Sequence, residues 1–412
     1  MTTNLITLTL TLGIAMLAQR SDAAIETKRL QPVPLTPGSE FGYAVAGQHP
    51  VWLLSAPGAS GGQGQIHVFD CTDAVCQQSQ TITGSGSTGF GRALALSNEW
   101  LAVGQPEVQR VSLYQRLAGT WVLHSTVQPT IPIVNGKFGS AVALDGTRLA
   151  VGAPGEGNGA GAVYIVDQIA DQWVQQVRLD APTVLRRLGH AMALDGDTLA
   201  VGAPYSAVPP GYAEGRVWVV RNVGGIWSEE ALLASPVPAS AELFGFAVDM
   251  QADRLVIGRP GASQSAVYDG AVDVFTRGND SSWTLETTLS ALSGSANERF
   301  GWSVGLDDEQ IVVGSPFALA NQTFLCGGST LYVHAVGQWS TTADAVHDRL
   351  PGGLAGFSVA LSSQRWMTGA PTFAESAGTG SGVGYWFDRV NGLFGHGFGL
   401  ADISCLPEAN RH

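Results

Sequence analysis

The sequence predicts an all-β protein in which seven four-stranded antiparallel units form a closed ring. Two linked motifs recur seven times at intervals of about 50 residues, and a period of this length marks a repeat architecture. Within each copy, short runs of alternating apolar residues are separated by turn-forming residues. The composition agrees, because 53 glycines and only 13% charged residues, against about 25% in average proteins, suit many short strands joined by tight turns.

The first motif is a Phe-Gly pair, and the second is a triplet related to Gly-Ala-Pro. The pairs or their equivalents begin at Phe41, Phe90, Phe138, Leu188, Phe244, Phe300 and Ala355. The triplets end at Pro57, Pro106, Pro154, Pro204, Pro260, Pro316 and Pro371. Because the two series keep step, every copy is expected to have the same internal order of strands.

The third copy illustrates this order. Residues 141–144 alternate small and larger apolar side chains, which predicts an innermost strand where neighbouring sheets converge. The turn Asp145-Gly146 leads to a second strand, residues 148–152, which ends at Ala-Pro because proline cannot donate a ladder hydrogen bond. Residues 163–166 form the most regular strand, and a tryptophan, Trp173, opens the fourth.

A tryptophan opens the fourth strand in five of the copies. These residues are Trp121, Trp173, Trp227, Trp283 and Trp339. Exposed tryptophans can serve as platforms on which sugars stack, but a fixed place in a repeat favours a packing role.

These units resemble the FG-GAP repeats of integrin α-subunits and of many exported bacterial proteins. The resemblance covers about residues 25–396 and implies a seven-bladed β-propeller, here bounded at residues 24–396. Elementary physics favours the same ring. A single four-stranded sheet cannot bury both of its faces, whereas seven sheets arranged radially can, and closure of the ring protects their edges.

The seventh copy predicts how the ring closes. It has three strands, residues 357–362, 365–369 and 383–389, and no convincing fourth. We predict that the N-terminal segment 25–31, which is similar to the end of a fourth strand, completes this last blade. Residues 393–400 are the alternative source of that strand.

The N-terminus carries an export pattern. Residues 5–17 are apolar, and Ser21-Asp22-Ala23 places small residues where a signal peptidase cleaves, so residues 1–23 are predicted to be a signal peptide. An apolar N-terminal strand is the alternative, since no Lys or Arg precedes the apolar run. Because no second long apolar stretch follows, we expect a secreted, periplasmic or extracellular protein that does not insert into a membrane.

Charge and cysteine usage restrict the partners and the compartment. The net charge is −13, only two lysines occur, and no basic run exists, so nucleic acid and anionic membranes are poor partners. Cys71 and Cys76 flank a turn-like spacer, which predicts a disulfide across a hairpin. This leaves Cys326 and Cys405 to pair, which would tie the C-terminal tail, residues 397–412, to the ring.

Catalytic and metal-binding motifs are weak. Ser60 lies in a G-x-S-x-G match, but a nucleophile elbow needs a strand followed by a helix, and no helix is expected here. In the resembling family, calcium is held by loops that space Asp or Asn at alternate positions. Here the corresponding turns are as short as Asp145-Gly146-Thr147 and Asp195-Gly196-Asp197, too few carboxylates for the usual six to eight or so oxygen ligands. We therefore predict no enzyme, no calcium site of that type and no other cofactor.

Two isolated features leave the function open. Asp249 is the only acid among the small residues of the innermost strands, where it would face solvent in a channel or bond locally. The sequons at Asn279 and Asn321 would carry glycans only in a eukaryotic secretory pathway.

The loops after the prolines grow longer in copies four to seven and carry aromatic residues. These residues are Tyr205, Tyr212, Tyr268, Phe317, Phe324 and Phe373. Aromatic side chains on a rigid scaffold can form a recognition surface, and the alternative is that they cap the ends of blades. In the integrin relatives the face with these loops contacts partners. We therefore expect a monomeric, non-catalytic binding or adhesion module for an extracellular protein or glycan, with a carbohydrate-binding lectin as the alternative and a hydrolase with a site in the central channel as the third.

Overall fold

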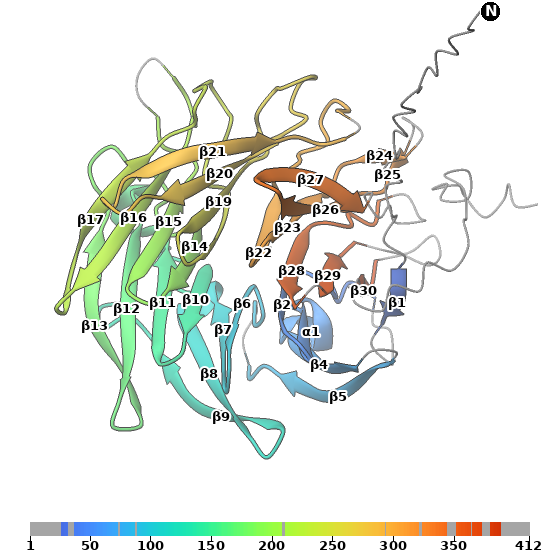
Figure 1. The fold of residues 1–412 in the computed structure, drawn as a ribbon. Coiled ribbons are helices and arrows are strands. Elements are labelled where there is room, and N and C mark those ends of the chain that lie inside the picture. The colour runs from blue at the N-terminus through green and yellow to red at the C-terminus, as the bar shows by residue number, and fades with distance from the viewer. Residues whose placement is uncertain are drawn as a thin grey trace, which may run out of the picture.

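The computed structural model describes residues 26–31, 37–72, 75–86, 89–207, 211–292, 294–320, 324–343, 352–363, 365–372 and 380–388. Within them, seven four-stranded antiparallel sheets follow one another around a common axis (Figure 1). The predicted fold class, an all-β seven-bladed propeller, is confirmed. The predicted signal peptide, residues 1–23, and the C-terminal tail, residues 397–412, lie outside the described residues.

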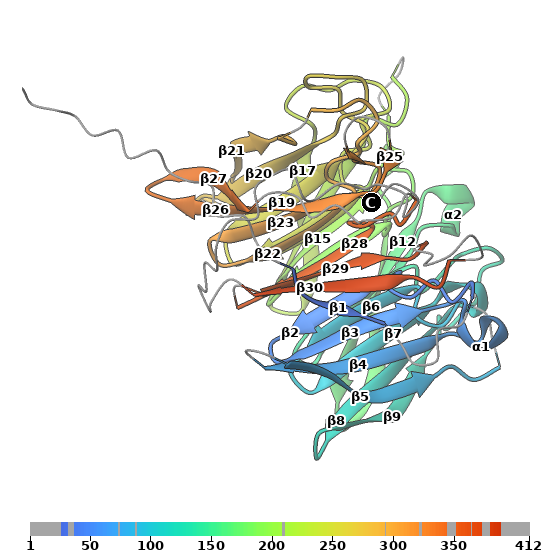
Figure 2. The same cartoon turned by 90° about the vertical axis from the view of Figure 1, so that its right-hand side faces the viewer.

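The blades run from the axis outwards in chain order, and the ends of the strands form the two faces of the ring (Figure 2). Blade 1 contains β2 (Val45–Gln48), β3 (Val51–Ala56), β4 (Gln65–Thr72) and β5 (Val75–Thr83). Blade 2 contains β6 (Ala93–Ser97), β7 (Trp100–Gln105), β8 (Arg110–Leu117) and β9 (Thr120–Val127). Blade 3 contains β10 (Ala141–Asp145), β11 (Arg148–Ala153), β12 (Ala162–Ile169) and β13 (Gln172–Asp180). Blade 4 contains β14 (Ala191–Asp195), β15 (Thr198–Ala203), β16 (Arg216–Val223) and β17 (Ile226–Leu233). Blade 5 contains β18 (Ala247–Gln251), β19 (Arg254–Arg259), β20 (Ala271–Arg277) and β21 (Trp283–Leu289). Blade 6 contains β22 (Ser303–Asp307), β23 (Gln310–Ser315), β26 (Gly328–Ala335) and β27 (Gln338–Ala343).

The loops between second and third strands hold a few short elements. These are α1 (Ala59–Gly62), η1 (Pro106–Val108), α2 (Glu156–Gly159) and the small sheet of β24 (Leu319–Ala320) and β25 (Phe324–Leu325). None of the helices in the described part of the chain is long and apolar enough to cross a membrane.

The seventh blade is built from both ends of the chain. It contains β28 (Ser358–Ser362), β29 (Arg365–Ala370) and β30 (Val383–Asp388), and its outermost strand is β1 (Glu26–Leu30), which pairs antiparallel with β30. Leu30 lies opposite Gly384 and is buried in the interface with blade 1. The predicted closure by the N-terminal segment is thus confirmed, and the alternative, residues 393–400, lies outside the described residues.

The two sequence motifs pack against each other at every blade boundary, which explains their glycines. Gly152, from a Gly-Ala-Pro triplet, has no room for a side chain, because a Cβ there would lie 2.1 Å from the carbonyl oxygen of Gly189 in the next blade. Gly189 belongs to the Leu-Gly equivalent of the Phe-Gly pair and has a φ of +85°, a region that glycine adopts without strain. The motifs are therefore the contact between consecutive blades.

Large side chains of the same motifs fill the blade cores. The phenylalanines of five Phe-Gly pairs are at most 1% exposed; they are Phe41, Phe90, Phe138, Phe244 and Phe300. Phe138, for example, makes an edge-to-face contact with Tyr164 of its own blade at 5.1 Å between ring centroids.

The tryptophans that open the fourth strands join adjacent blades. Trp283 donates from Nε1 to Glu230 of the preceding blade (2.8 Å), and Trp339 donates in the same way to Glu286 (2.8 Å). Trp121 is 3% exposed and exchanges two backbone hydrogen bonds with the Gln80 amide. These contacts agree with the packing role expected from their fixed place in the repeat.

A belt of hydrogen bonds surrounds the axis at the hairpin turns that follow the innermost strands. At each of the seven blade boundaries, the side chain that ends an innermost strand accepts a bond from a turn N–H of the next blade. The acceptor and donor pairs are Ser362 and His49 (3.1 Å), Gln48 and Asn98 (2.8 Å), Ser97 and Gly146 (2.9 Å), Asp145 and Gly196 (2.8 Å), Asp195 and Ala252, Gln251 and Asp308, and Asp307 and Ser363. The belt closes between blades 7 and 1 as well. We call this end of the axis the hairpin rim.

Cys71 and Cys76 form a disulfide between directly opposed residues of β4 and β5, as the hairpin prediction required. Cys326 is buried and disulfide-bonded. Its predicted partner, Cys405, lies outside the described residues.

Candidate functional site

The residue that follows each Phe-Gly glycine lies at the end of the axis opposite the hairpin rim. We call this end the Phe-Gly rim and define it by Tyr43, Arg92, Ser140, His190, Phe246, Trp302 and Phe357. The glycine before each of them has a φ between +85° and +91°, which turns the chain from the inter-blade loop into the innermost strand. All seven side chains are half-buried, so each presents part of its surface to solvent.

Five of these side chains form a continuous aromatic arc across blades 4, 5, 6, 7 and 1. The centroid distances are 4.8 Å from His190 to Phe246, 4.6 Å from Phe246 to Trp302, 5.9 Å from Trp302 to Phe357 and 5.1 Å from Phe357 to Tyr43. Aromatic pairs attract at these separations, so each ring fixes the orientation of its neighbours. The arc is therefore a preorganised surface, because the repeated backbone places one of these side chains at the same position in each blade.

Two of the predicted loop aromatics extend the arc outwards. Tyr205 contacts His190 edge-to-face at 6.2 Å and is 40% exposed. Phe317 contacts Trp302 edge-to-face at 5.5 Å. Both residues come directly after the proline of their triplets, which places them beside the rim residue of the same blade.

The other predicted loop aromatics do not join this cluster among the described residues. Tyr212 is 70% exposed and makes no described ring contact. Tyr268 is half-buried and packs against the guanidinium of Arg299, 4.4 Å from its ring centroid. Phe324 lies in β25, and nothing further is described of its side chain; Phe373 lies outside the described residues.

His190 acts as an uncharged aromatic ring in the arc. Burial lowers its pKa to about 4, because the surrounding rings exclude the water that would solvate the imidazolium. It is therefore neutral at physiological pH and does not repel the arginines nearby.

Arginines lie over the tyrosines at both ends of the arc. The guanidinium of Arg187 is 5.7 Å from the centroid of Tyr205, and that of Arg92 is 4.5 Å from the centroid of Tyr43. Both distances fall within the range of a cation–π contact. Arg92 also pairs with Glu40 at 3.4 Å, whereas Arg187 pairs with no carboxylate in the described chain.

The Phe-Gly rim corresponds to one position of the sequence repeat, but this position is hard to recognise because its residue type differs from copy to copy. The position after Phe-Gly is occupied by tyrosine, arginine, serine, histidine, phenylalanine, tryptophan and phenylalanine in turn. Only an inspection of this column across all seven copies, combined with the ring geometry, reveals the arc.

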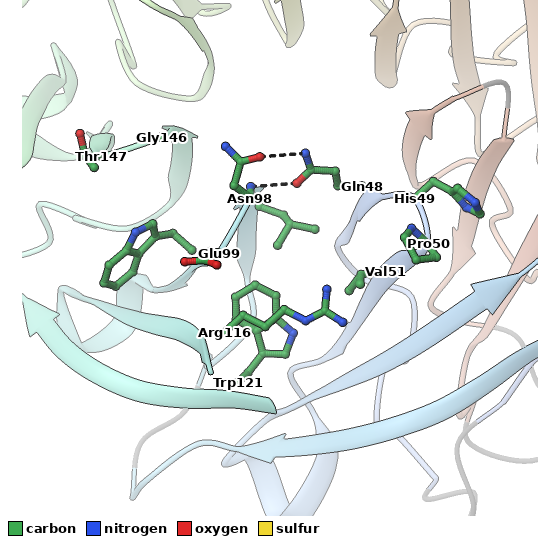
Figure 3. Close-up of a pocket in the computed structure, with 12 residues that line it drawn as sticks. Gln48, His49, Pro50, Val51, Asn98, Glu99, Arg116, Trp121, Gly146 and Thr147 are labelled. Carbon is green, nitrogen blue, oxygen red and sulfur yellow. Dashed lines mark hydrogen bonds between the residues drawn. The ribbon is translucent and has the colours of Figure 1, made fainter. Parts of the chain in front are cut away.

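The hairpin rim holds an open cavity of about 600 Å³ between blades 1, 2 and 3 (Figure 3). Gln48 and Asn98 are joined across its edge by two hydrogen bonds, and Arg116 and Trp121 contribute side chains to it. Arg116 is already engaged, with its Nη2 3.5 Å from the Asp70 carboxylate.

Asp249 bonds locally, one of the two roles considered from its sequence position. Its carboxylate accepts from the N–H of Met250 (2.9 Å) and from the N–H of Leu306 in blade 6 (2.7 Å). Burial and, to a smaller extent, the nearby Asp307 and Asp195 carboxylates raise its pKa to about 6. It serves as a link between blades 5 and 6.

The weak catalytic motif lacks its partners. Ser60 is exposed in α1, whose interior departs from helical geometry, and it bonds to no histidine among the described residues. In the same residues, no group of three or more His, Cys, Asp or Glu side chains is placed to hold a metal ion. The predicted lack of a calcium site stays a prediction.

Comparisons with known proteins support the repeat and the fold. A family model of the FG-GAP repeat matches residues 134–166 and 283–325. A search of curated protein sequences finds no significant match. Among solved structures, the β-propeller domain of Cps50 (Swd1) from Myceliophteria thermophila is 11% identical with a TM-score of 0.53, covering 87% of this chain and 98% of its own. A protein from Lactobacillus plantarum is 16% identical with a TM-score of 0.49, covering 75% and 86%. At such identities the likeness to the Cps50 domain concerns the fold alone.

Proposed function

We propose that this chain, an FG-GAP repeat propeller, is an exported, non-catalytic binding or adhesion module that holds a protein or surface partner on its Phe-Gly rim. The observation that carries the proposal is the continuous aromatic arc from His190 to Tyr43. Half-exposed aromatic side chains on a rigid frame provide contact area at little cost in conformational entropy, as in binding hot spots.

The other features are consistent with this role. The disulfide between Cys71 and Cys76 suits an oxidising compartment outside the cell. Tyr205 and Phe317 widen the arc towards the loops, where the longest insertions of the repeat lie. We expect the protein to act as a monomer, because the ring closes its own sheets and leaves no blade incomplete.

A carbohydrate-binding lectin is the second candidate function, and the same arc favours it, because aromatic faces also pack against sugar rings. A hydrolase is the third candidate. Among the described residues Ser125 is hydrogen-bonded to its neighbour His124 (3.2 Å), whose other ring nitrogen lies 3.3 Å from Asp171. Ser125 and His124 lie on β9, the outermost strand of its blade, and not in the central channel where the hydrolase site was expected, which makes the hydrolase the weakest candidate.

The test compares two variants of the purified protein. Phe246→Ala/Trp302→Ala removes the centre of the arc, and Ile226→Ala alters a 71% exposed side chain on an outer hairpin, at the hairpin-rim side. Immobilised wild type and variants are incubated with cells and culture fluid of the source organism, and the retained material is quantified. The proposal requires that the arc variant loses most retention while the control keeps it, and equal retention by all three would refute it.

A further inference from the structure

The Phe-Gly rim carries a cationic corner on a chain whose net charge is −13. We define the arginine corner as Arg186, Arg187 and Tyr205. Both arginines are exposed, and none of the salt bridges in the described chain includes either of them. Arg186 donates from Nη1 only to the carbonyl oxygens of Leu185 (2.9 Å) and Thr183 (3.4 Å). Two consecutive residues thus expose guanidinium groups that form no ion pair with a carboxylate among the described residues.

The arginine corner is continuous with the aromatic arc. The guanidinium of Arg187 lies over Tyr205, and Tyr205 contacts His190, the first ring of the arc. At the other end, Arg92 lies over Tyr43. Arg92 is paired with Glu40, so only the Tyr205 end carries an uncompensated guanidinium group. At that end a cation from a partner would be repelled, whereas an anion would be attracted.

The backbone of the rim has little left to offer a ligand. The N–H groups of Gly189, Gly245 and Gly301 donate to carbonyl oxygens of Gly202 (3.2 Å), Gly258 (3.1 Å) and Gly314 (3.2 Å). A peptide that binds by adding a strand needs unpaired backbone groups, and this surface instead presents ring faces and guanidinium forks. Such a surface suits a ligand made of rings that carry acidic groups.

The hairpin rim at the opposite end of the axis carries charges that are already engaged. Asp195 and Asp307 each accept a backbone hydrogen bond from the next blade, and Arg148 and Arg254 pair with Asp197 and Glu309. An anionic ligand would have to displace these carboxylates there, whereas Arg186 and Arg187 form no ion pair in the described part of the chain.

We propose that the Phe-Gly rim binds an anionic glycan, whose carboxylate or sulfate groups pair with Arg187 and Arg186 while its sugar rings pack on the aromatic arc. This inference rests on the proposed function of the same surface, takes its second candidate, carbohydrate binding, and names the ligand class. Guanidinium groups bind carboxylates and sulfates by paired, charge-assisted hydrogen bonds, and dispersion holds the rings.

Isothermal titration calorimetry with defined oligosaccharides tests the inference. Two pairs of probes are compared, each with a charged and a neutral member. The carboxylate pair is oligogalacturonate and its methyl ester, which has the same rings without charge. The sulfate pair is dextran sulfate and dextran. The expected result is that at least one charged member binds about tenfold or more tightly than its neutral counterpart, with an affinity that falls as salt rises. The pair with the larger ratio identifies carboxylate or sulfate as the preferred group.

Two variants separate recognition by the corner from nonspecific attraction. Arg187→Glu is expected to weaken binding of the charged sugar about tenfold or more, since it reverses one charge on an exposed side chain. The matched control, Arg116→Glu, makes the same change at the hairpin rim and is expected to bind as wild type does, with thermal melting used to check that both variants fold.

Several results would overturn the inference. They are equal affinity for charged and neutral sugars, equal loss in both variants, binding of polyglutamate as tight as that of the sugar, and no binding of any probe. If the glycan probes fail while Phe246→Ala/Trp302→Ala still abolishes retention of native partner, the ligand class is wrong and the proposed function stands.

Discussion

Asp249 makes the stability of the ring depend on pH in a direction that the structure specifies. The pKa of its carboxyl is about 6 in the folded protein, against 3.8 for an unperturbed aspartate, because the group is buried between blades. Between about pH 4 and pH 6 the folded state holds a proton that the unfolded state releases. Its contribution to the free energy of unfolding therefore falls as the pH rises through this window.

The magnitude follows from the size of the shift. A difference of about two pKa units corresponds to about 3 kcal/mol, at 1.36 kcal/mol per unit. Asp249→Ala removes this dependence, together with two hydrogen bonds whose loss costs about 1 kcal/mol each. Because an unperturbed aspartate is already about half ionised at pH 4, the variant should gain about 2 kcal/mol relative to wild type between pH 4 and pH 8.

Urea denaturation followed by tryptophan fluorescence at pH 4, 5, 6, 7 and 8 measures this difference. Subtracting the wild-type curve from the variant curve cancels the titration of the carboxyl groups that do not interact with Asp249, which leaves Asp249 and its neighbours Asp195 and Asp307. A difference in unfolding free energy that stays constant across the range would refute the assignment of a raised pKa to Asp249. A difference that changes in the opposite direction would show that the folded protein favours the ionised carboxylate.

Three further predictions concern the frame that carries the rim. Deletion of residues 26–31 removes the outer strand of the seventh blade and should abolish cooperative unfolding, and an unchanged calorimetric transition would contradict the closure. Gly152→Ala places a methyl group against the Gly189 carbonyl oxygen and should cost about 3 kcal/mol or prevent folding, as measured by urea denaturation; a wild-type midpoint would show that the blades do not meet there. Trp283→Phe removes the indole donor of Glu230, which keeps its ion pair with Arg277, and should cost about 1 kcal/mol in urea denaturation; an unchanged midpoint would show that this bond does not stabilise the ring.

Much of the fold followed from the sequence because its determinants are local and repeated. The alternation of residues 141–144, the Asp145-Gly146 turn and the proline that ends each second strand specify strands without reference to the rest of the chain. The missing fourth strand of the last copy, together with the similarity of the N-terminal segment to a fourth-strand ending, identified residues 25–31 as the closing strand.

The functional surface followed only in part because it is assembled from seven distant positions. Tyr205 and Phe317 were selected for their aromatic rings on long loops, and they join the arc; Tyr212 was selected on the same grounds and stands apart. The arc itself was missed because residues as different as His190 and Trp302 occupy one structural position.

The belt at the hairpin rim was missed for a related reason. Its acceptors are serine, glutamine and aspartate, which have in common a side-chain oxygen and a place at the end of an innermost strand. In the sequence they read as ordinary turn residues, and their bonds to the next blade become visible only when the ring is closed.

The most direct test of the central claim, that the Phe-Gly rim is the binding surface, is hydroxyl-radical footprinting of the protein with and without its bound partner. Partner binding should lower the reactivity of Tyr43, Phe246, Trp302 and Phe357 and leave the exposed hairpin residues Ile226 and Val336 unchanged. Protection of the two hairpin residues with unchanged reactivity at the rim would contradict the claim and assign binding to the opposite face.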